Sequence, residues 1–134
     1  MSDKTFAPTV MRSMLGRARG LGSAKSGTAH WWAERVTAAA LVPLSLWFVF
    51  SIFRLEGAPR AAVAHWAAWP VNATLLAALV LTTFHHVQLG LQAVIDDYIH
   101  GEAARLVVLL AMRAGCVLLA LAALIAVLKL AFTG

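Results

Sequence analysis

The hydrophobic pattern of this 134-residue chain is dominated by three apolar stretches, each long enough to cross a lipid bilayer. The first comprises 18 uncharged residues, 36–53. As an α-helix it would be about 27 Å long and would just span a hydrocarbon core. The second covers about residues 70–95 and the third about residues 106–132, interrupted by Arg113. The pattern predicts an all-α membrane protein with three transmembrane helices, at about residues 34–54, 70–96 and 105–132.

Polar segments separate these predicted spans. Residues 54–66 form a predicted short loop that ends in an interfacial turn with Trp66 and Trp69, because tryptophan favours the membrane–water interface. Residues 96–105 form the second polar connection. The N-terminal residues are polar, basic and glycine-containing, and we expect a cytoplasmic arm there that packs on a partner. The predicted organisation is therefore a basic arm, residues 1–29, followed by a membrane-anchor domain, residues 30–134.

The composition supports this membrane assignment. Hydrophobic residues make up 61% of the chain and charged residues only 13%, which is too little polar surface for a soluble domain of this size. The formal net charge is +5, but the basic residues crowd the N-terminus beside the first apolar stretch. They therefore indicate topology and contact with anionic lipid head groups rather than nucleic-acid binding. The single cysteine, Cys116, has no partner for an internal disulfide, and any metal must be bound through histidine or carboxylate.

The distribution of basic residues predicts the orientation of the bundle. Six Lys or Arg residues lie within residues 1–35, and Arg105 in the second connection makes seven on one side of the membrane. The other side has three, namely Arg54, Arg60 and Lys129. By the positive-inside rule the N-terminus and the second connection lie in the cytoplasm, and the first loop and the C-terminus in the periplasm. The N-terminus also lacks the continuous apolar region of a secretory signal, so we expect a multi-pass protein of the bacterial inner membrane.

The candidate chemistry gathers on the second predicted span. His85 and His86 lie inside it, where polar groups usually face a bundle interior or a cofactor. At roughly 100° per residue they point in different directions, so only one can face a given cofactor squarely. Gly90 follows His86 by one turn on nearly the same face, and Asp97 returns to within about 20° of it. Imidazole is a natural axial ligand of haem iron, and a glycine beside it lets the flat macrocycle approach the backbone.

Depth along this helix separates two kinds of site. The rise from His86 to Asp97 is about 16 Å, which places His86 near mid-membrane and the pair Asp97 and Tyr98 at the cytoplasmic interface. A buried cofactor and a polar pocket near the surface would then share one face of one helix. Two simpler interpretations stay open, namely an interhelical hydrogen bond for His86 and an interfacial anchor for the Asp–Tyr pair.

Two arginines near the spans extend the candidate site. Arg35 begins the first span, where it is either a boundary charge or a guanidinium directed at a carboxylate, a haem propionate or a quinone carbonyl. Arg113 lies about 12 Å past Arg105 toward the membrane centre, and a charge at that depth needs a partner. A haem propionate, Asp97 or a group on another chain are the candidates.

These residues resemble the hydrophobic membrane-anchor subunit of succinate dehydrogenase, respiratory complex II. Residues 30–41, with the sequence HWWAERVTAAAL, are similar to the family's stretch entering its first helix, with the family's arginine at Arg35. Arg105 matches an arginine that follows the family's tyrosine by seven residues. The family's histidine, its glycine four residues later and its Asp-Tyr pair after eleven and twelve residues are matched by His86, Gly90, Asp97 and Tyr98. The resemblance covers roughly residues 28–132.

The resemblance implies roles for individual residues. His86 would be one axial ligand of a haem b shared with the complex's other membrane-anchor subunit, which would supply the second ligand, and Gly90 would pack against the haem. Tyr98 would hydrogen-bond a ubiquinone carbonyl, with Asp97 and Arg35 in the polar network of that site. The adjacent His85 and the intramembrane Arg113 depart from the family pattern.

The resemblance also implies partners. Electrons would arrive from an iron–sulfur subunit on the cytoplasmic face, and succinate chemistry would belong to a flavoprotein subunit. The chain would have no enzymatic activity alone, and whether three complexes form a trimer stays open. Two other functions are weighed against this one. The first is a haem-free structural anchor of a related respiratory complex, and the second is a component of a small transporter or channel.

Overall fold

The structure is a computed structural model that describes Met14 and residues 27–133. Most of the predicted basic arm, residues 1–29, lies outside the described residues. The described part contains no strand, and helices account for nearly all of it. The helices that position the rest of the molecule are α2 (Gly27–Leu55), α3 (Arg60–Ala68), α4 (Pro70–Tyr98) and α5 (Glu102–Thr133).

The three long helices α2, α4 and α5 are each long and apolar enough to cross a membrane. This confirms the predicted fold class, an all-α protein with three transmembrane helices. The helices extend beyond the predicted spans, because α4 continues to Tyr98 and α5 begins at Glu102. The polar connection between them is therefore reduced to residues 99–101.

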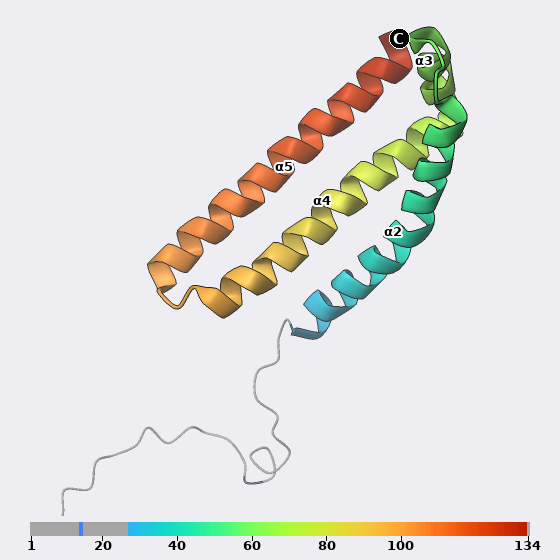
Figure 1. Ribbon diagram of the computed structural model, residues 1–134. Helices are drawn as coiled ribbons and strands as arrows, with labels where there is room; N and C mark the ends of the chain where they lie inside the picture. Colours follow the sequence, from blue (N-terminus) through green and yellow to red (C-terminus); the bar gives the residue numbers. More distant parts are fainter. Residues whose placement is uncertain (1–13, 15–26, 134) are drawn as a thin grey trace, which may run out of the picture.

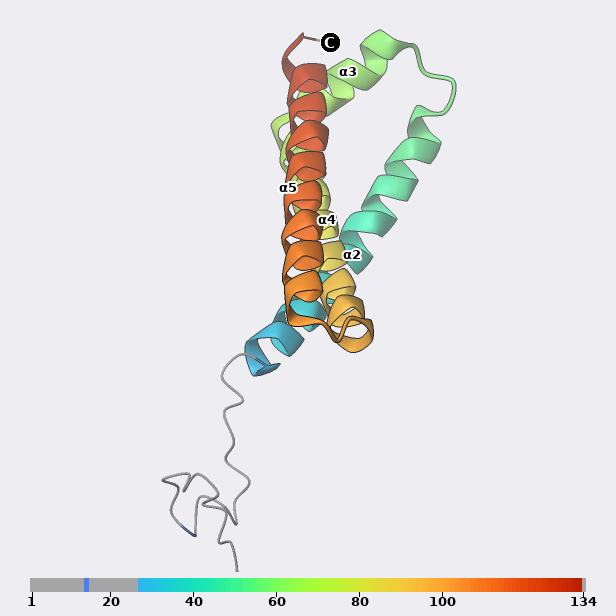
Figure 2. The same cartoon turned by 90° about the vertical axis from the view of Figure 1, so that its left-hand side faces the viewer.

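Helix α4 is the centre of the bundle. It packs along both α2 and α5, whereas α2 and α5 hardly touch each other. Figure 2, which turns the view of Figure 1 by 90°, shows the reason, because α2 diverges there from the other two helices toward the end that carries α3. The helix α2 continues through Pro43, which removes one backbone hydrogen-bond donor, and its ribbon is visibly curved. Several large side chains of α4, among them Leu81, Val87 and Leu91, are exposed and therefore left uncovered by this chain.

A short helix, α3, lies across the end of the bundle where α2 ends and α4 begins (Figure 1). It extends the predicted interfacial turn to nine residues. Gly57 has φ 73°, a conformation that favours glycine, and it turns the chain after α2. Trp66 stacks on Trp47 of α2 with ring centroids 5.8 Å apart, and Asn72 of α4 donates a hydrogen bond to the Trp66 carbonyl at 2.8 Å. These contacts attach α3 to both neighbouring helices.

The chain buries few of its own side chains. Within the described residues the buried apolar side chains are Ala64, Ala67, Leu76, Leu89 and Cys116, and no large side chain is fully buried. Many large apolar residues of the long helices are exposed instead, among them Leu46, Phe50 and Leu119. In a bilayer such surfaces contact lipid or other membrane subunits.

Ala67 is 0% exposed and belongs to α3, which packs on α4 and α5. Substituting Ala67→Leu should overpack this contact and destabilise the protein by about 1–3 kcal/mol. The matched control is Ala62→Leu on the exposed side of the same helix. Thermal denaturation followed by tryptophan fluorescence should show a lower midpoint for Ala67→Leu than for Ala62→Leu. Equal midpoints would show that α3 is not packed as described.

Candidate functional site

His86 is the predicted site residue that the structure places most firmly. It is half-buried on α4, and its ring nitrogen Nδ1 lies 2.8 Å from the hydroxyl oxygen of Thr37 on α2. Thr37 is itself buried, at 9% exposure. The contact joins residues 49 positions apart in the chain. It is therefore a tertiary polar contact between two membrane-spanning helices.

The neighbouring His85 has different surroundings. It is exposed, and within the described part of the chain no hydrogen bond or ion pair holds its ring. The two histidines thus point in different directions, as the helical pitch predicts. Of these two adjacent histidines, only His86 is held in place by a second helix.

Gly90 lies one turn beyond His86 and is exposed on the same side of α4. A Cβ atom built at this position would meet nothing within 4 Å. The surface beside His86 is therefore open, and a flat ligand could approach the α4 backbone there.

The C-terminal end of α4, which is the end predicted to be cytoplasmic, presents Asp97 and Tyr98 to the outside of the chain. Tyr98 is the last residue of α4 and is 79% exposed, and Asp97 is exposed as well. The adjacent Asp96 forms an ion pair with Arg105 of α5 at 3.3 Å, across the short connection. Of the two aspartates, Asp96 is therefore engaged within the chain, while Asp97 has no hydrogen bond or ion pair among the described residues.

Arg35 lies deeper than Tyr98. Its guanidinium carbon lies 5.1 Å from the centre of the Trp31 ring, a cation–π contact one turn earlier on α2. Arg35 precedes Thr37 by two residues, or about 3 Å of helix, whereas Tyr98 follows His86 by about 18 Å. Since α2 and α4 run in opposite directions (Figure 1), both lie on the predicted cytoplasmic side of the Thr37–His86 contact. Counted along the two helices, their backbone positions therefore differ by about 15 Å, and the predicted shared quinone network stays a prediction.

Arg113 finds its partner in this chain on α4. Its guanidinium donates a hydrogen bond to the side-chain carbonyl of Gln92 at 3.0 Å. Of the three candidate partners, Asp97 is not the one this chain uses. Contact with a haem propionate stays a prediction, because Arg113 is exposed and a guanidinium has further N–H donors beyond the one that Gln92 accepts.

Sequence reasoning missed two residues of these polar contacts, Thr37 and Gln92. Both are polar residues within predicted spans, and that signal could have identified them, because intramembrane polar groups need partners. Their partners could not be identified in advance, because each contact depends on how two helices are rotated against each other.

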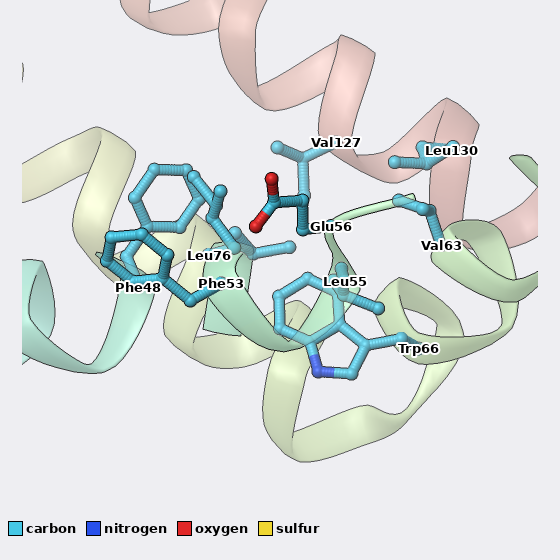
Figure 3. A pocket seen from close by; sticks show the side chains of 10 residues that line it. Phe48, Phe53, Leu55, Glu56, Val63, Trp66, Leu76, Val127 and Leu130 are labelled. Carbon is cyan, nitrogen blue, oxygen red and sulfur yellow. The ribbon is translucent and has the colours of Figure 1, made fainter. Parts of the chain in front are cut away.

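A large apolar cavity lies at the opposite end of the bundle. It has a volume of about 600 Å³ and is lined by α2, α3, α4 and α5. Figure 3 shows Glu56 reaching in among aromatic and aliphatic side chains, including Phe48, Trp66 and Leu76. None of the predicted site residues lines it, so the cavity is separate from the candidate chemistry.

Comparisons with known proteins identify the family. The family model of the succinate dehydrogenase/fumarate reductase transmembrane subunit matches residues 9–129. The succinate dehydrogenase hydrophobic membrane anchor subunit of Rickettsia bellii is 33% identical over 116 residues, which cover 87% of this chain and 93% of that protein. The corresponding subunit of Paracoccus denitrificans is 31% identical over 105 residues, covering 78% of this chain and 81% of that protein. No solved structure matches the chain significantly.

These matches confirm the resemblance read from the sequence. Together with the three apolar helices they identify a multi-pass protein of the inner membrane that assembles with other subunits of a complex. The chain belongs to the succinate dehydrogenase/fumarate reductase transmembrane subunit family, as a membrane-anchor subunit of succinate dehydrogenase.

Proposed function

We propose that this anchor subunit holds a haem b through His86 and forms part of the site at which ubiquinone is reduced. The observation that carries the proposal is the position of His86. Its Nδ1 is in hydrogen-bonding contact with the Thr37 hydroxyl at 2.8 Å, so Nε2 is the ring nitrogen that remains available to a ligand. Histidines that bind metals usually have their second ring nitrogen engaged in this way.

The surroundings of His86 also fit a haem. Gly90 leaves open space beside the ring, and both residues lie on one side of α4. No cluster of three His, Cys, Asp or Glu side chains occurs in residues 27–133, so a site built around a single axial ligand suits this chain better than a multi-ligand ion site. When bound, the haem supplies one-electron chemistry, while the chain supplies binding, orientation and the surrounding polarity.

The open bundle supports a shared site. Because α2 and α5 hardly touch, part of α4 is left without cover from this chain, and most large apolar side chains are exposed. We infer that the other membrane-anchor subunit of the complex covers this surface and supplies the second axial ligand. We assign Arg113 as the residue of this chain that contacts a haem propionate. Gln92 accepts a hydrogen bond from its guanidinium and so helps to hold that group in place.

The cytoplasmic end of α4 supports the quinone assignment. Tyr98 and Asp97 are exposed and adjacent, and Asp97 keeps its carboxylate available because Arg105 pairs with Asp96 instead. In the proposal the Tyr98 hydroxyl donates a hydrogen bond to a ubiquinone carbonyl, with Asp97 in the same polar network. We assign Arg35 to the same polar network, at a position deeper in the membrane than Tyr98. The iron–sulfur subunit would deliver electrons at this face, and succinate would be oxidised in the flavoprotein subunit.

Replacing His86 should remove the haem. In the purified complex, His86→Ala should lose the optical spectrum of a bis-histidine haem, because the variant removes the imidazole that the Thr37 contact holds in place. The matched control is His85→Ala, which removes an adjacent but unoriented imidazole and should keep the spectrum. A spectrum retained in His86→Ala would contradict the ligand assignment. Absence of iron and of a Soret band from the unmodified complex would favour the haem-free anchor.

Replacing Tyr98 should affect quinone reduction alone. Tyr98→Phe keeps the exposed ring at the end of α4 and removes the hydroxyl, so we expect quinone reduction to fall by about tenfold or more, the cost of one hydrogen bond of about 1.5 kcal/mol. Succinate oxidation with an artificial electron acceptor should be preserved, since that reaction does not need the quinone site. Unchanged quinone kinetics would contradict the role of Tyr98.

A further inference from the structure

The hydroxyl of Thr37 has more neighbours than it has hydrogens. It lies 2.7 Å from the carbonyl oxygen of Ala33, 3.1 Å from that of Glu34 and 2.8 Å from Nδ1 of His86. A threonine hydroxyl has one hydrogen to donate and two lone pairs that accept. The two carbonyl oxygens can only accept. The three distances therefore limit how the hydrogens can be placed.

One arrangement places a hydrogen in each of the two shortest contacts. If Thr37 donates to the Ala33 carbonyl, its oxygen accepts a hydrogen bond from an Nδ1–H of His86, and both short contacts contain a hydrogen. If Thr37 instead donates to Nδ1, two oxygens face each other at 2.7 Å with no hydrogen between them. In a membrane-spanning bundle no water is at hand to relieve that repulsion. The first arrangement is therefore favoured, and it gives His86 a proton on Nδ1 and a lone pair on Nε2.

We propose that Thr37 is a positioning residue that holds His86 in the Nδ1–H tautomer, so that Nε2 is presented to the haem iron. This inference rests on the proposed role of His86 as axial ligand. Thr37 suits the task because a threonine in a helix has a restricted χ1 angle, and its hydroxyl bonds to carbonyls three or four residues earlier. Ala33 and Glu34 are those carbonyls. The orientation of the hydroxyl is thus set within α2 and does not depend on the contact with His86.

The contact should also adjust the properties of the haem. A carbonyl, a hydroxyl and an imidazole N–H form a chain of hydrogen bonds that polarise one another. Such a chain makes the imidazole a stronger electron donor, which favours ferric over ferrous iron and lowers the midpoint potential. It also fixes the plane of the ring, because rotation would break the Nδ1 hydrogen bond.

The experiment uses the complete complex carrying Thr37→Val, Thr37→Ser or Ser51→Ala. Valine is close to threonine in shape and lacks the hydroxyl, while serine restores it. Ser51 is the matched control, because it is buried on the same helix and donates to the carbonyl four residues earlier, that of Trp47, at 2.8 Å. It lies fourteen residues from Thr37 and bonds to no other helix within the described residues. The readouts are haem content, the midpoint potential and the low-spin electron paramagnetic resonance spectrum.

We expect Thr37→Val to weaken haem binding about 10–100-fold, as the loss of a group that supports a metal ligand does. It should also raise the midpoint potential by up to about 59 mV, which corresponds to a tenfold change in the ratio of ferric to ferrous affinity. Thr37→Ser should restore both, and Ser51→Ala should change neither. If Thr37→Val binds too little haem for titration, retention of haem in Thr37→Ser supports the proposal. Loss in both variants overturns it.

Two further results would overturn the inference. One is a Thr37→Val complex with the potential, spectrum and haem content of the unmodified protein. The other is an equal shift in Ser51→Ala, which would assign the effect to packing of α2 in general. Failure of the underlying function is distinguishable, because it appears as a haem spectrum retained in His86→Ala. If His86→Ala loses the haem while Thr37→Val changes nothing, only the role of Thr37 is rejected.

Discussion

The hydrocarbon interior of the bilayer is the constraint on which this structure depends. Because no water is present there, backbone groups must bond within each helix, and polar side chains must find partners in the protein. Isolated hydroxyls of the long helices meet this demand locally, as when Ser51 and Thr74 donate to carbonyls four residues earlier. Larger polar groups meet it between helices, where His86 bonds to Thr37 and Gln92 to Arg113.

Both interhelical contacts involve α4, and this gives the bundle its organisation. His86 connects α4 to α2, and Gln92, six residues later, connects it to α5. The two residues differ by about 120° around the helix, which matches the position of α4 between its neighbours. Neither contact joins α2 to α5 directly, and those two helices hardly touch each other. The exposed apolar face of α4, together with the single axial ligand that we propose for His86, suits a site shared with another chain.

The sequence predicts the fold well and the site only in part. Long uncharged stretches identify the three spans, because length and apolarity are sufficient to predict a membrane helix. The face shared by His86, Gly90 and Asp97 follows from helical pitch. The helix α3 was expected only as a turn, since its nine residues are mostly alanines and form no long apolar stretch. The partner of His86 was unpredictable, because helices that are apolar nearly all round do not reveal which faces meet.

Arg35 shows a different limit of sequence reasoning. Its place at the start of the first uncharged stretch predicted that it begins the first span on the cytoplasmic side. The helix in fact begins at Gly27, eight residues earlier, so Arg35 lies more than two turns inside it. Charge boundaries locate the apolar part of a helix and not its first residue, since the helix can continue into the head-group region.

Magnitudes indicate what the Thr37–His86 hydrogen bond contributes. Interhelical hydrogen bonds in membrane proteins stabilise the fold by only about 0.6 kcal/mol on average, a small part of the roughly 5–15 kcal/mol that holds a typical domain together. Losing a group that supports a metal ligand weakens metal binding by about 10–100-fold, which corresponds to about 1.4–2.7 kcal/mol. The same contact therefore matters more for the state of His86 than for the packing of α2 on α4. Apolar packing alone could hold these helices together, but it could not select which nitrogen of the imidazole carries the proton.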